Sequence, residues 1–152
     1  MCIRRITMAF HYLSSIILLL ILTYCAFEDL KSSSLPLSAI ILFAAGGILI
    51  QLIFRQTDLL SLICGCGAGG LLVVLAYLSG GSFGCGDALM FIVTGIYLGF
   101  KSNIMLILVS LLLSAAASLL LMAALKLRAK SQVPFMPFVL GGYITMLAVN
   151  IL

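Results

Sequence analysis

The stretch DALMFIVTGIYLGF, from Asp87 to Phe100, decides the fold of this chain, because it is apolar yet too short to cross a membrane alone. Its 14 residues would form about 21 Å of helix, whereas the hydrocarbon core of a bilayer is about 30 Å thick. A spanning helix must therefore begin before Asp87, or the bilayer must thin. In either case the Asp87 carboxylate lies below the lipid headgroups and faces protein or trapped water.

The composition of the whole chain is typical of an integral membrane protein. Of its 152 residues, 64% are hydrophobic and 8% are charged, which is far from the balance of a soluble domain. The net charge of +4 comes from scattered lysines and arginines, without the basic runs and interleaved aromatic residues that bind nucleic acid. The five cysteines match neither a disulfide framework nor a C-x-x-C metal site, and we expect no metal and no cofactor.

Five further apolar runs are long enough to cross a bilayer as helices. They cover residues 8–27, 35–54, 59–78, 104–125 and 133–152. Together with the shorter run from Ala88 to Phe100, they predict an all-α polytopic membrane protein, a bundle of six antiparallel transmembrane helices. The connections, among them 28–36 and 101–103, are short and polar, so residues 1–152 are expected to form a single transmembrane domain.

Two acidic residues are brought to one face of the membrane by this count of spans. Two spans separate Asp29 from Asp87, and two more separate Asp87 from the loop that contains Lys126. An ionisable residue within a span is penalised by roughly 2.5–3.5 kcal/mol on insertion scales, so it usually has a function. Two carboxylates held close together share one proton and can activate water against a peptide carbonyl, which is the chemistry of aspartic proteases.

Plainer interpretations of the same residues stay open. Asp87 could cap a helix, and Asp29 could pair with Lys31 or be solvated in a loop. Gly84 and Gly86, which precede Asp87, support a functional interpretation, because glycine can adopt left-handed backbone conformations and lets a substrate strand approach closely.

Three motifs carry a resemblance to a known family. FGCGDALMF, residues 83–91, resembles the G-x-G-D signature of intramembrane aspartic proteases. DLKSSSLP, residues 29–36, resembles the first-aspartate motif of type IV prepilin peptidases, and VPFMPFVLGGY, residues 133–143, resembles the stretch that opens the last span of these enzymes.

The resemblance implies a membrane endopeptidase that cleaves the short basic leader of type IV pilin-like precursors, usually after a glycine. Asp29 and Asp87 correspond to the catalytic pair. One would act as general base toward the attacking water, while the other, protonated, polarises the scissile carbonyl and later protonates the leaving amine. Gly84 and Gly86 correspond to the motif glycines, which shape the backbone.

The chain also departs from the family pattern. Leu37 and Leu89 stand where the family often has Asn and Lys, which leaves the substrate preference open. Larger members carry a cytoplasmic insert with paired C-x-x-C motifs that binds zinc and accompanies methylation of the new terminus. This chain lacks that insert, so the resemblance implies a short, peptidase-only form. Its expected partners are membrane lipid and pilin-like precursors with a basic leader and an apolar helix.

Charge alone leaves the membrane orientation open. Placing the aspartates in the cytoplasm puts equal numbers of basic residues on both sides. We therefore expect the site on the cytoplasmic side of a prokaryotic plasma membrane from the family resemblance only. Lys126, Arg128 and Lys130 are expected to be interfacial anchors, or alternatively to contact substrate or lipid headgroups.

Two other kinds of function remain as alternatives. In a small membrane carrier or accessory protein, the same two carboxylates would form a proton or cation path. In a purely structural bundle, both acids would be helix caps.

Overall fold

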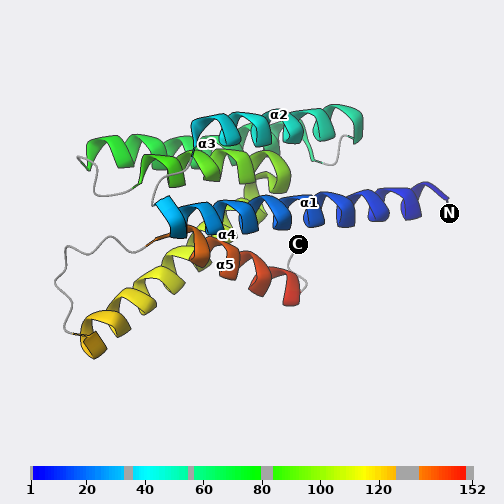
Figure 1. Cartoon of the computed structure of the whole chain (residues 1–152). Helices are drawn as coiled ribbons and strands as arrows, with labels where there is room; N and C mark the ends of the chain where they lie inside the picture. Colours follow the sequence, from blue (N-terminus) through cyan, green and yellow to red (C-terminus); the bar gives the residue numbers. More distant parts are fainter. Residues whose placement is uncertain (1, 33–35, 55–56, 80–83, 126–133, 150–152) are drawn as a thin grey trace.

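The computed structural model is all-α and describes residues 2–32, 36–54, 57–79, 84–125 and 134–149. Within these residues there are five helices: α1 (Cys2–Ser32), α2 (Leu37–Phe54), α3 (Leu59–Leu78), α4 (Cys85–Leu125) and α5 (Met136–Ala148). Helix α4 packs against each of the other four, and α5 contacts both α1 and α4 (Figure 1).

The helix boundaries agree closely with the prediction for α2 and α3, and differ for α1. Helix α3 covers the predicted 59–78, and α2 starts two residues after the predicted start. Helix α1 continues past the predicted end at Phe27 as far as Ser32, whose hydroxyl donates a hydrogen bond to the Glu28 carbonyl at 3.0 Å. The expectation that Asp29 lies in a loop is therefore wrong, because the last turn of α1 includes it.

Helix α4 takes the place of two predicted spans, and Gly99 divides it. This glycine has φ +71° and ψ −174°, so the helix is broken there into the segments 85–98 and 100–125. In a straight helix, residues 91 and 103 would be about 18 Å apart along the axis. Asn103 Nδ2 instead donates to the Phe91 carbonyl at 3.1 Å, so the second segment turns back beside the first (Figure 1).

The predicted loop at 101–103 is thus wrong, and its polar residue is buried. The Asn103 side chain has no exposed surface and also donates to the Gly65 carbonyl at 3.0 Å, while its own oxygen accepts from the Thr94 hydroxyl at 2.7 Å. These bonds satisfy backbone carbonyls beside the break, where the helical pattern is interrupted. Asn103 is therefore a structural residue that closes the turn of α4.

Glycines let α3 and the first segment of α4 approach backbone to backbone. A Cβ atom added to Gly95 would lie 2.5 Å from the Gly65 carbonyl oxygen, and one added to Gly65 would lie 2.9 Å from the Gly95 oxygen. Gly69 faces the backbone of Ile92 in the same way. Small residues at such contacts are typical of helix pairs packed within a membrane. The segment that carries Asp87 is therefore held firmly against α3.

The length and the surface of the helices are those of a membrane protein. Three stretches are long and apolar enough to cross a membrane: Leu13–Ser32, Leu59–Leu78 and Cys85–Leu120. Helices α2 and α5 are apolar but shorter, and α5 covers 13 residues of the predicted run 133–152. Large hydrophobic side chains are exposed along all five helices, as expected for a surface in contact with lipid.

Candidate active site

Asp29 is a buried carboxylate that contacts the beginning of another helix. It lies in the last turn of α1 with 6% of its surface exposed. Its Oδ2 accepts a hydrogen bond from the backbone N–H of Met136, the first residue of α5, at 3.0 Å. N–H groups at a helix start have no partner within their own helix and favour a nearby negative charge. Asp29 therefore supplies from α1 the acceptor that α5 needs.

The sequence around Met136 explains why α5 uses a distant cap. Phe135, at the N-cap position, offers no side-chain cap hydrogen bond. Pro137, in the first turn, has no N–H to donate and has a backbone angle suited to a helix start. The N–H of Met136, directly before the proline, therefore has no partner within α5. Asp29 accepts its hydrogen bond from α1.

Asp87 lies in the first turn of α4, which begins at Cys85. Of the two alternatives given above, the helix does begin before Asp87, but its first segment, 85–98, is still only 14 residues long, so thinning of the bilayer stays a prediction. The Asp87 side chain is half-buried and bends back over Gly84: a Cβ atom at position 84 would lie 2.5 Å from Asp87 Oδ2. The absence of a side chain at Gly84 therefore leaves room for the carboxyl group.

The two motif glycines do not use the left-handed backbone conformations that are open to glycine. Among the described residues, Gly99 is the glycine with positive φ. Gly84 directly precedes α4, and Gly86 is half-buried in its first turn. The contribution of Gly84 is thus steric, since its missing Cβ accommodates the carboxyl group of Asp87.

Printed contacts bring the end of α1, which carries Asp29, to the start of α4, which carries Asp87. Contacts one turn away from each aspartate hold the three helices together. Cys25 and Met90, one turn from Asp29 and Asp87 respectively, contact each other through their sulfur atoms at 3.9 Å.

A second contact links α4 to the segment before α5. The rings of Phe91 and Phe135 meet edge to face, with centroids 6.0 Å apart. Phe91 lies one turn after Asp87, and Phe135 directly precedes the Met136 amide that bonds Asp29. The two aspartates thus lie where α1, α4 and the start of α5 meet.

The remaining predicted site residues are three basic side chains of the loop before α5. Lys126, Arg128 and Lys130 lie outside the described residues. Within the described part of the chain, no group of three or more histidine, cysteine or acidic side chains could hold a metal ion. What the arrangement offers chemically is two carboxyl groups at the junction of α1, α4 and α5, one of them held by a backbone donor.

The Met136 amide is the part of the site that sequence reasoning missed. The motif VPFMPFVLGGY was recognised as a resemblance, but no role was assigned to any of its atoms. The two prolines at 134 and 137 were a usable signal, because they mark a helix start whose first N–H is available.

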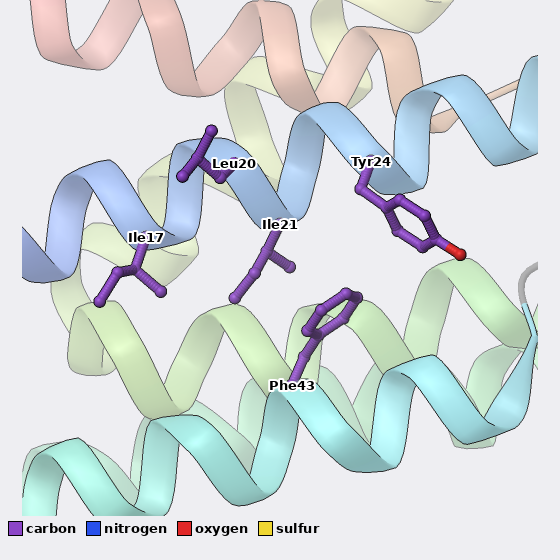
Figure 2. A pocket seen from close by; sticks show the side chains of 5 residues that line it. All are labelled: Ile17, Leu20, Ile21, Tyr24 and Phe43. Carbon is purple, nitrogen blue, oxygen red and sulfur yellow. The ribbon is translucent and has the colours of Figure 1, made fainter.

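A separate apolar groove of about 360 Å³ lies between α1 and α2 (Figure 2). Its lining consists of large apolar and aromatic side chains: Ile17, Leu20, Ile21, Tyr24 and Phe43. At 100° per residue, Asp29 projects from α1 about a third of a turn away from this line of side chains. The groove is therefore distinct from the place where the aspartates lie.

Comparison with known proteins identifies the family. No curated protein and no solved structure matches the chain. The sequence model of the type IV leader peptidase family matches residues 16–119, which is more than half of the chain and includes both Asp29 and Asp87. The chain therefore belongs to the type IV leader peptidase family.

Proposed function

We propose that this chain is a membrane-embedded aspartic endopeptidase that removes the basic leader of type IV pilin-like precursors, with Asp29 and Asp87 as its catalytic pair. Family membership implies an aspartic peptidase with prepilin substrates. The observation that supports the proposal is the junction of the three helices: Asp29 is buried and bonded to the start of α5, and Cys25 and Met90, each one turn from an aspartate, are in contact.

The chemistry follows from the pair. One carboxylate takes a proton from a water molecule as the water oxygen attacks the scissile carbonyl carbon. The other, protonated, donates a hydrogen bond to the carbonyl oxygen and then passes its proton to the leaving amine as the C–N bond breaks. Side chains make both proton transfers, so the reaction needs no cofactor.

The membrane topology that serves this function has six crossings within one domain, residues 1–152. The reversal of α4 at Gly99 supports this topology, because the segments 85–98 and 100–125 run in opposite directions. The first segment has 14 residues, about 21 Å of helix, so its crossing requires a locally thinned bilayer. Six crossings place the end of α1 and the start of α4 on one side. By the nature of the substrates, we assign that side to the cytoplasm of a prokaryotic cell.

The test is cleavage of a pilin-like precursor by the purified chain in lipid vesicles, with the products measured by mass spectrometry. We expect one cut at the end of the basic leader, and loss of the cut in Asp29→Asn and in Asp87→Asn. Asp58→Asn is the matched control, because Asp58 is exposed and its side chain makes no capping hydrogen bond to α3.

Two outcomes would contradict the proposal. Cleavage that survives either catalytic substitution would show that the pair is not the catalyst. A wild-type chain that leaves the precursor intact, but conducts protons in a way that the same substitutions abolish, would favour a carrier.

A further inference from the structure

The line of side chains that forms the apolar groove on α1 ends at an acidic residue. Ile17, Ile21 and Tyr24 point from α1 toward α2 (Figure 2). They are four and then three residues apart, which is the repeat of one helix face, and the next position of this repeat is Glu28. The groove is therefore apolar along its length and has a carboxylate just beyond its end, one turn after Tyr24.

Glu28 is an acidic residue that the proposed chemistry does not use. The chain has four acidic residues, of which two form the proposed catalytic pair. Asp58 directly precedes α3, which the six-crossing topology places on the other side of the membrane. Glu28 is partly exposed, directly precedes Asp29, and forms no ion pair with any described residue, Lys31 included. Its negative charge can therefore act on a ligand that reaches Asp29.

The groove lies at the depth that the apolar helix of a precursor would occupy. In the proposed function, the bond to be cut lies level with Asp29, at the junction of the basic leader and the apolar helix. Tyr24 and Ile17 precede Asp29 in α1 by about 7 and 18 Å along the helix axis. A precursor helix that enters the membrane beside α1 and runs antiparallel to it would place residues about 5 to 12 past the bond against the groove.

The size of the groove suits one face of a helix. It has a volume of about 360 Å³ and runs along about two turns of α1, whereas a whole helix with its side chains is about 10–12 Å across. Phe43 of α2 forms the opposite wall, and its ring meets the Tyr24 ring edge to face with centroids 5.9 Å apart. Apolar side chains of a helix lying along α1 would fill this space by close packing, which drives the association of helices within a bilayer.

Charge favours a precursor over a lipid as the occupant. An acyl chain would also fit an apolar groove, but Glu28 would then repel an anionic headgroup above it. The leader of a precursor is basic. Because adjacent Cα atoms are about 3.8 Å apart, a lysine within a few residues of a bond held at Asp29 can reach Glu28. A basic segment followed by an apolar helix therefore matches both the end of the groove and its lining.

We propose that the groove between α1 and α2 is the docking site for the apolar helix of the pilin-like precursor, and that Glu28 at its end binds a basic side chain of the leader. The inference rests on the proposed peptidase function and deepens it, because it states how the substrate is held beside the aspartates. Glu28 takes no part in the proton transfers, so its contribution is to substrate affinity and to the choice of leader.

Kinetics with a synthetic precursor test the role of Glu28. The probe is a peptide with a short lysine leader, a glycine and about twenty leucine and alanine residues, in phosphatidylcholine vesicles. We expect Glu28→Gln to raise KM about 2- to 5-fold with a smaller change in kcat, since one charge pair is lost at a partly exposed site. Asp58→Asn, which removes an acidic side chain before α3, should leave both constants unchanged.

A charge exchange separates recognition of the leader from a merely structural effect. Glu28→Lys should cut a peptide with a glutamate leader at a lower KM than the wild type does, and should lose the preference for lysine. An unchanged preference for lysine in Glu28→Lys would overturn the role of Glu28.

Photo-cross-linking locates the apolar helix without any need for cleavage. Benzoylphenylalanine replaces Tyr24 in one chain and Tyr77 of α3 in the matched control, each together with Asp87→Asn so that the peptide stays whole. We expect position 24 to label the peptide about five residues past the glycine. Position 77 should label it far less, although Tyr77 is 86% exposed, because α3 does not pack against α1 among the described residues.

Each other outcome has a definite meaning. Adducts of position 24 with lipid alone or with a second copy of the chain, or equal labelling of the peptide from position 77, would overturn the docking site. If these results occur while the wild type cuts the precursor, this inference alone is rejected. If the wild type leaves the precursor intact, the proposed function fails, whereas labelling from position 24 at the expected depth would still support the groove as a docking site.

Discussion

Among the single residues, Gly84 has the most direct steric relation to the proposed chemistry. Its missing Cβ leaves the space into which Asp87 Oδ2 projects, 2.5 Å from where that atom would be. Gly84→Ala should displace the carboxyl group and lower the rate of precursor cleavage by about 100-fold, the loss typical of a 1 Å misplacement. The measurement is the single-turnover cleavage rate in vesicles.

Gly67→Ala is the control for this change, because a Cβ at position 67 meets nothing within 4 Å. It should leave the cleavage rate unchanged. Equal rates for Gly84→Ala and the wild type would show that the carboxyl group has another position during catalysis.

Sequence reasoning found the two aspartates but not how they are held. An acid within an apolar chain is costly, and that cost made Asp29 and Asp87 recognisable. The donor to Asp29 is a backbone N–H, and every residue except proline has one, so its residue type carries no signal. The steric role of Gly84 was likewise hidden, since it depends on the direction of one side chain.

At the scale of elements, the pair formed by α3 and the first segment of α4 is the most constrained. A Cβ at Gly95 would lie 2.5 Å from the Gly65 oxygen and 2.6 Å from its carbonyl carbon, and these backbone atoms cannot rotate away. Gly95→Ala should therefore lower the free energy of unfolding by about 1–3 kcal/mol. Denaturant titration in mixed micelles measures this change.

Gly70→Ala, on α3, is the comparison, since nothing lies within 4 Å of a Cβ there. It should be neutral or stabilise the chain by up to about 1 kcal/mol, as alanine does in a helix. A Gly95→Ala variant as stable as Gly70→Ala would mean that α3 and α4 are farther apart than described.

Helix boundaries could be predicted where hydrophobicity changes abruptly, as for α3. The turn of α4 could not be placed, because polarity at 101–103 fits a solvated loop as well as a buried hydrogen-bonding residue. Asn103 is the latter, and the break is at Gly99, where φ is +71°. Hydropathy does not record backbone conformation, so the one-residue turn was invisible to it.

For the whole molecule, the proposed six crossings make a prediction about sidedness. In a chain whose native cysteines are replaced, a cysteine at Lys31 should be reached by a membrane-impermeant maleimide only after the cells are opened. One at Lys101 should be reached in intact cells. Both native lysines are exposed, so the substitutions should be tolerated. Labelling of both positions from the same side would contradict the two opposite crossings of α4.

The all-α architecture was predictable because a hydrophobic chain has few ways to satisfy its backbone in lipid. The way in which the helices pack against one another was harder to predict. The meeting of α1, α4 and α5 depends on contacts such as Cys25 with Met90 and Phe91 with Phe135, which join residues far apart in the sequence.

The most direct measurement of the central claim is cross-linking between positions 29 and 87. In a chain without native cysteines, Asp29→Cys and Asp87→Cys should form a disulfide, or a bridge through a short bifunctional reagent, detected by peptide mass mapping. Asp29→Cys with Asp58→Cys should give none. If the 29 and 87 cysteines each react singly with a small maleimide but never join, the two aspartates do not meet and the account of a shared catalytic site is wrong.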